Sequence, residues 1–152
     1  MKVTVLLRND HEALKTLFNK FGKPASVRAS SGTKDLLDEI LRQTRIHVQM
    51  EREILYSALS ESSAAHGPSL VSKAEQQLQN VEKLMRDVSV LNVSDKTFQS
   101  AMTSLIAEVT QHIKLDEEEI FDEARKILPE YRLEELGLEM EDRRKILTTL
   151  AA

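Results

Sequence analysis

Apolar residues recur every three or four positions along most of this chain, which is the spacing of one face of an α-helix. Four long stretches show the pattern, at about residues 3–21, 33–60, 68–91 and 95–128. Glycine, proline or small polar residues separate them, as at Gly22 and Pro129. A fifth stretch, at about 130–150, has one apolar face made of Leu133, Leu136, Met140, Leu147 and Leu150.

Long amphipathic helices with short connections favour an all-α fold, an up-down-up-down antiparallel four-helix bundle. We expect a single domain over residues 1–152, with the bundle at about 3–128. The short fifth helix, at about 130–150, is expected to lie across the bundle or to cover one end. The predicted core stripes include Ile54 and Ala58 on the second helix and Val71 and Leu78 on the third.

Polar residues stand in three of the stripes, where the pattern calls for apolar ones. They are His11 in the first stretch, His47 and Glu51 in the second, and His112 and Asp116 in the fourth. In the second and fourth stretches the histidine precedes the acid by four residues, so both side chains lie on one face of the helix. One buried polar residue is often an ordinary hydrogen-bonded core group. Five on three helices would each cost several kcal/mol without partners, and a shared cation satisfies them together. The spacing therefore predicts a metal site.

The ligand types narrow the choice of metal. Imidazole and carboxylate without thiolate suit iron, manganese or zinc. A carboxylate on each of two helices could offer its second oxygen to another ion about 3.5–4 Å away, which favours a bridged di-iron site over one zinc. Ferritin-type sites need a glutamate three residues before histidine, and none of the four histidines has one.

Composition excludes several other classes of protein. The chain has no cysteine, which excludes disulfides and iron–sulfur clusters with cysteine ligands. Its net charge is −4, and acidic and basic residues are interspersed along the chain without a basic cluster, so no nucleic-acid partner is expected. No run of about 18 apolar residues or signal peptide is present, so we expect no membrane span and a cytoplasmic location. His66, in a small-residue loop, is interpreted as a surface residue.

Three segments of the sequence resemble motifs of the haemerythrin-like (HHE cation-binding) family. Residues 10–18 are similar to the family's opening Asp-His-x-x-Leu-x-x-Leu-Phe phrase, and residues 47–56 and 112–121 to its two His-x-x-x-Glu-Glu-x-x-Leu-Phe-Pro phrases. Asp116 stands where Glu is usual, and Glu117 is an alternative ligand because classical members space this acid five residues after the histidine. Leu78 falls where the third helix of the family carries a histidine.

The resemblance implies one intact metal position, with His11, His47, Glu51 and Asp116. The second position keeps His112 and the two carboxylates but lacks an imidazole. Three outcomes are open: a water or small ligand fills the gap, Glu75 or Glu82 reaches in from the third helix, or a single metal binds.

Three functions are compatible with these observations. The first is a non-haem iron protein that binds O2 or NO, or that responds to oxidants, as the resemblance implies. The second is a weak iron-dependent oxidase or peroxidase, because an iron short of one ligand has an open coordination position. The third is a metal-free structural or interaction bundle with a decayed site. No separate acid–base or nucleophile constellation stands out, so we expect binding rather than catalysis.

Overall fold

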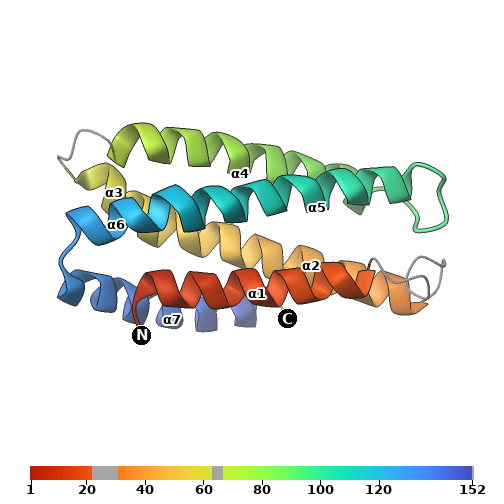
Figure 1. Ribbon diagram of the computed structural model, residues 1–152. Helices are drawn as coiled ribbons and strands as arrows, with labels where there is room; N and C mark the ends of the chain where they lie inside the picture. The colour runs from red at the N-terminus through yellow and green to blue at the C-terminus, as the bar shows by residue number, and fades with distance from the viewer. Residues whose placement is uncertain (22–30, 63–66, 152) are drawn as a thin grey trace.

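The computed structural model describes residues 1–21, 31–62 and 67–151. These residues form four long rods and a fifth helix beside them, drawn from red to blue in Figure 1. The elements in chain order are α1 (Val3–Phe21), α2 (Ser31–Met50), η2 (Glu51–Tyr56), α3 (Ser57–Glu61), α4 (Gly67–Ser89), α5 (Phe98–Leu115), η3 (Asp116–Ile120), α6 (Phe121–Ile127) and α7 (Glu130–Ala151). The second rod is α2, η2 and α3, and the fourth is α5, η3 and α6.

Successive rods run in opposite directions, so the predicted up-down-up-down bundle is confirmed. The interior follows the stripes because each amphipathic helix turns its apolar face away from water, and each buried aliphatic side chain contributes about 1.5–3 kcal/mol. All six stripe residues of α1 are buried: Val3, Leu7, His11, Leu14, Phe18 and Phe21. No helix within the described ranges is long and apolar enough to cross a membrane.

The second rod departs from the prediction after Glu51. Ile54 and Ala58 were expected in the core, but Leu55 and Leu59 are the fully buried residues, at 0% exposure. The cause is the π-helical turn η2, in which each backbone N–H donates to the carbonyl five residues earlier instead of four. The extra residue in this turn shifts the buried face by one position along the sequence. A regular α-helical period therefore gives the wrong residues here.

The placement of the C-terminal helix was also predicted wrongly. α7 is 22 residues long and packs along α1 and α2, instead of crossing the bundle or covering its end. Leu150, expected on its buried face, is 75% exposed.

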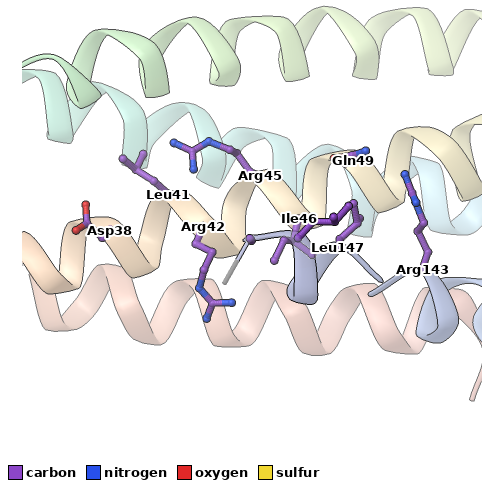
Figure 2. A pocket seen from close by; sticks show the side chains of 10 residues that line it. Asp38, Leu41, Arg42, Arg45, Ile46, Gln49, Arg143 and Leu147 are labelled. Carbon is purple, nitrogen blue, oxygen red and sulfur yellow. The ribbon is translucent and has the colours of Figure 1, made fainter. Parts of the chain in front are cut away.

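On the third rod, Leu70 is buried where Val71 was predicted. A groove of about 560 Å³ runs between α2 and α7, with Arg42, Arg45 and Arg143 along it (Figure 2).

Gly137 is the point of closest approach between α7 and the N-terminal end of α1. A Cβ atom at this position would lie 1.9 Å from the carbonyl oxygen of Met1 and 3.2 Å from the nitrogen of Val3. The crossing of the two backbones therefore requires a residue without a side chain.

Gly137→Ala is expected to destabilise the protein by about 1–3 kcal/mol, because overpacking outweighs the roughly 1 kcal/mol gained in helix propensity. Urea unfolding would measure the change. Leu138→Ala, at the exposed neighbouring position, is the control and should alter stability much less. A Gly137→Ala protein as stable as wild type would contradict the close approach.

Candidate metal centre

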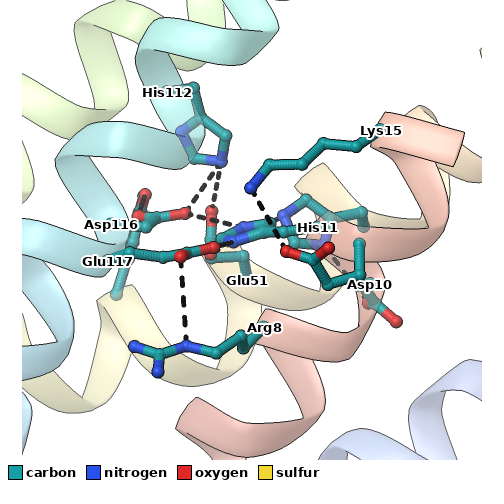
Figure 3. Close-up of polar contacts among 11 residues, drawn as sticks. Arg8, Asp10, His11, Lys15, Glu51, His112, Asp116 and Glu117 are labelled. Carbon is teal, nitrogen blue, oxygen red and sulfur yellow. Dashed lines mark hydrogen bonds and ion pairs between the residues drawn. The ribbon is translucent and has the colours of Figure 1, made fainter. Parts of the chain in front are cut away.

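The five polar residues predicted from the stripes converge at one place inside the bundle (Figure 3). Each has an exposure of 2% or less, and one nitrogen or oxygen atom from each lies within 4.8 Å of the corresponding atom of every other. The donors come from α1, from the junction of α2 and η2, and from the junction of α5 and η3. They are His11, His47, Glu51, His112 and Asp116.

The two carboxylates lie between the three imidazoles. Nε2 of His112 is 2.9 Å from Oε1 of Glu51 and 3.0 Å from Oδ2 of Asp116. The same Asp116 oxygen is 3.3 Å from Nε2 of His11, on the facing helix. Nε2 of His47 is 3.7 Å from the second oxygen of Glu51. All three Nε2 atoms therefore face carboxylate oxygens in one small, buried volume.

Although these buried atoms lie close together, none of them forms a hydrogen bond of good geometry with any described residue. The unpaired atoms include the three Nε2 atoms, both oxygens of Glu51 and Oδ2 of Asp116. Leaving such groups unsatisfied costs about 1–3 kcal/mol each, and more when they are charged. Donors around one ion at about 2.1 Å span about 4.2 Å, close to the 4.8 Å found without an ion. The donor set fits a metal ion.

Two of the imidazoles are oriented by a second carboxylate behind them. Nδ1 of His11 is 2.7 Å from Oε2 of Glu117, and Nδ1 of His47 is 3.2 Å from Oδ2 of Asp10. A proton on each Nδ1 would leave the Nε2 lone pair facing the cluster, as in many carboxylate–histidine–metal arrangements. Glu117, considered as an alternative ligand, thus lies behind His11.

The third rod of the bundle, α4, contributes none of the cluster's donor atoms, and all of its residues are described. Glu75 and Glu82, considered as substitutes for the absent histidine, both pair with the guanidinium of Arg52 at 2.8 and 2.7 Å. They are partly exposed and do not reach the cluster. Leu78 is fully buried. His66 lies outside the described residues.

Tyr56 is a functional candidate that is not among the five residues predicted from the stripes. Its hydroxyl donates a hydrogen bond to Oδ1 of Asp116 at 2.8 Å, and the residue is 2% exposed. It follows Glu51 by five residues, which in an α-helix places the two about 140° apart. The π turn η2 instead brings residues five apart onto one face. The repeated acid-to-aromatic spacing in the sequence was the available signal.

Phe121 holds the equivalent position five residues after Asp116, at the end of the second π turn, η3. It is fully buried, and its ring stacks on the imidazole of His11, with centroids 5.8 Å apart and planes 5° from parallel. This apolar ring covers the cluster on the α1 side and fixes the plane of the His11 ring.

Electrostatics shows what the cluster lacks when no cation is bound. Burial, together with the charge of Asp116, raises the pKa of Glu51 to about 7. Burial disfavours the charged form of His112, but the carboxylates of Asp116 and Glu51 raise its pKa well above the ordinary value. Burial also opposes ionisation of Asp116, yet the charge of His112 lowers its pKa. Protons are therefore retained where positive charge is needed, and a metal ion would displace them.

Comparison with known proteins identifies the family and the fold of this chain. Residues 3–124 match the family described as Hemerythrin HHE cation binding domain. Among solved structures, the chain is similar to a hemerythrin HHE cation-binding domain-containing protein from Mycobacterium kansasii. The TM-score is 0.84 and the identity 21%, over 97% of this chain and 87% of that chain. No curated protein matches significantly. The likeness to the solved structure supports the fold, and the match over residues 3–124 confirms the resemblance seen in the motifs. The chain belongs to the haemerythrin HHE cation-binding domain family.

Proposed function

We propose that this protein binds non-haem iron in the buried cluster and uses it to bind or respond to O2, NO or oxidants. The observation that carries the proposal is the convergence of three imidazoles and two carboxylates whose facing atoms are buried and unpaired. Iron suits a set of nitrogen and oxygen donors without thiolate, and manganese or zinc are the alternatives that metal analysis separates.

The chain's own residues would hold the ion and keep water away from it. His11, His47 and His112 supply neutral nitrogen donors, and the carboxylates of Glu51 and Asp116 balance the cation's charge. Phe121, which stacks on His11, is fully buried and apolar, as are Leu55 and Ile120 in the π turns that carry Glu51 and Asp116. When bound, iron would supply redox chemistry and a coordination position for a small diatomic or oxidant.

The number of ions follows from the count of donors. The five facing atoms suffice for one position. A second ion in a carboxylate-bridged pair would use the other carboxylate oxygens, and α4 supplies no imidazole to complete it. Among the described residues, the phenol oxygen of Tyr56 is a further oxygen beside Asp116, 2.8 Å from its Oδ1. We therefore propose one strong position and a second, weaker one.

A weak oxidase or peroxidase activity is the second candidate. The observation that favours it is the missing donor of the third helix, since an incomplete ligand set leaves a position open to peroxide. Turnover of peroxide by the iron-loaded protein, absent in its iron-free form, would support this candidate.

Metal analysis and spectroscopy test the proposal directly. The protein would be purified aerobically, and iron, manganese and zinc counted per chain. Visible spectra would follow before and after reduction, reoxidation and exposure to NO. About one or two irons per chain, with spectra that change on reduction and with NO, are expected. Failure to bind iron after anaerobic reconstitution with Fe(II) would refute the proposal and favour a metal-free structural bundle.

Leu78→His is expected to raise iron occupancy toward two per chain, because it restores the imidazole that the family carries on the third helix. Iron would be counted after identical reconstitution of both proteins. Leu84→His, at a half-buried position on the same helix, controls for adding a histidine to α4. Unchanged occupancy in Leu78→His would contradict the alignment of α4 with the family's third helix.

Tyr56→Phe is expected to lower occupancy of the second position while the first stays filled, because only the phenol oxygen is lost. Losing its hydrogen bond should cost about 1 kcal/mol of stability. Iron counting and the visible spectrum would detect the change. Tyr131→Phe, at the 68% exposed second tyrosine, is the control. Identical occupancy and spectra in Tyr56→Phe and wild type would exclude Tyr56 as a donor.

A further inference from the structure

The C-terminal helix reaches the metal centre through one chain of polar contacts. On α7, Nη2 of Arg144 donates to both oxygens of Asp10, at 2.7 and 2.9 Å. Oδ2 of Asp10 is also 3.2 Å from Nδ1 of His47. Asp10 therefore lies between an arginine of α7 and an imidazole whose Nε2 faces the cluster. Figure 3 shows Asp10 beside the cluster on α1.

The position of the Asp10 carboxylate depends on Arg144. The carboxylate side chain is 15% exposed, so solvent covers little of it, and the guanidinium contacts both of its oxygens. Its partner His47 is buried, with 3% of its side chain exposed. A small cavity of about 280 Å³ next to this chain is lined by Asp10, His47, Arg42 and Arg144. Without Arg144, Asp10 would be free to turn into this space.

The other two imidazoles have no such link to α7; the carboxylate behind His11, that of Glu117, lies 3.9 Å from Nε of Arg8 on α1 instead. Nδ1 of His11 contacts Glu117, which adjoins the ligand Asp116 on the same rod. Nδ1 of His112 has no hydrogen-bond partner among the described residues. Only for His47, among the three histidines of the cluster, do the described contacts run to α7. This helix lies beyond the segment that matches the family, which ends at residue 124.

We propose that Arg144 is a positioning residue of the metal centre. It fixes Asp10 so that this carboxylate accepts the Nδ1 proton of His47 and directs the Nε2 lone pair at the cation. The inference rests on the proposed metal binding and adds α7 to the elements that determine affinity. Partners behind a metal-bound histidine typically change affinity about 10–100-fold when they are removed.

The neighbouring residue Arg143 provides a matched control. Its guanidinium also forms an ion pair across helices, with Glu53 at 2.7 Å, and its side chain is 32% exposed against 37% for Arg144. Arg143 lines the groove between α2 and α7 (Figure 2), and Glu53 is not part of the cluster. A purely structural role for these ion pairs predicts similar effects of Arg143→Ala and Arg144→Ala.

The experiment compares metal affinity in four variants of the full chain. Fe(II) would be titrated anaerobically against a chromophoric chelator for wild type, Arg144→Ala, Arg144→Lys, Arg143→Ala and Asp10→Asn. Unfolding of each metal-free protein would be measured in parallel. Arg144→Ala and Asp10→Asn should weaken binding about 10–100-fold, Arg144→Lys should recover part of the loss, and Arg143→Ala should stay within about twofold of wild type.

Each remaining outcome counts against the inference. Equal affinities of Arg144→Ala and Arg143→Ala, with wild type binding iron, would overturn the role of Arg144 and leave the proposed function standing. If the loss of Fe(II) affinity is proportional to the loss of stability of the metal-free protein in both Arg143→Ala and Arg144→Ala, the role of Arg144 is structural only and the inference is wrong. Absence of iron binding by wild type would overturn the proposed function and this inference together.

Discussion

Glu51→Gln is expected to abolish tight iron binding while leaving the metal-free protein at least as stable as wild type. Glu51 is fully buried, neither of its oxygens forms a hydrogen bond of good geometry with a described residue, and one lies 2.9 Å from Nε2 of His112. The amide keeps the shape but removes the negative charge. Since even partners behind a ligand are worth about 10–100-fold, loss of this ligand should cost about 100-fold or more in affinity.

The stability of the metal-free form should depend on pH through the same residue. Its pKa rises from 4.5 to about 7 on folding, because of burial and the charge of Asp116. The folded state therefore binds the proton more tightly than the unfolded chain, so stability falls as pH rises from about 4.5 to 7. Above pH 7 the wild-type protein has lost roughly 3 kcal/mol of folding stability relative to pH below 4.5. Glu51→Gln has no carboxyl group at this position, so its stability does not fall in this way.

Two measurements check this prediction. Anaerobic Fe(II) titration gives the affinity, and urea unfolding of the metal-free proteins at about pH 5 and pH 8 gives the stability. The stability of Glu51→Gln relative to wild type should be greater at the higher pH. Glu61→Gln, on the exposed end of α3, serves as the control. A variant that binds iron like wild type would exclude Glu51 as a ligand.

Removing the metal from the wild-type protein is expected to lower its melting temperature by roughly 5–10 °C. A ligand present at about 100 times its dissociation constant stabilises the folded state by about 2.7 kcal/mol. For a chain of about 150 residues, each kcal/mol shifts the midpoint by about 2–4 °C. The cation also relieves the mutual repulsion of Glu51 and Asp116, which is why the effect should centre on this cluster.

Scanning calorimetry with and without a chelator would measure the shift, and added Fe(II) should restore it. The shift should grow as pH rises toward 7 and above, because fewer protons then compete for Glu51. Glu51→Gln should show little change with either reagent. Equal midpoints for the iron-loaded and chelated wild type would contradict a buried site that binds metal tightly.

The sequence by itself determined the helices, the bundle and the membership of the donor cluster. This was possible because His47 and Glu51, and likewise His112 and Asp116, stand four residues apart where the regular α-helix ends, before the π turn changes the register, so the backbone alone puts them on one face. His11 continues the apolar stripe of α1 and is buried with it. Polar residues in buried stripes indicate a shared partner, since burial without one is costly.

Only the tertiary structure decided which residues are buried after Glu51 and which contacts cross between helices. The π turn moves burial from Ile54 to Leu55 and turns Tyr56 toward Asp116, against the α-helical period. Glu75 and Glu82 pair with Arg52 outside the cluster.

The contact of Arg144 with Asp10 joins residues 134 positions apart. Local periodicity carries no information about such a pair, because it forms only once α7 has packed along α1 and α2. The helix faces are set by the backbone geometry of neighbouring residues, whereas the surroundings of the metal centre are set by which helices meet.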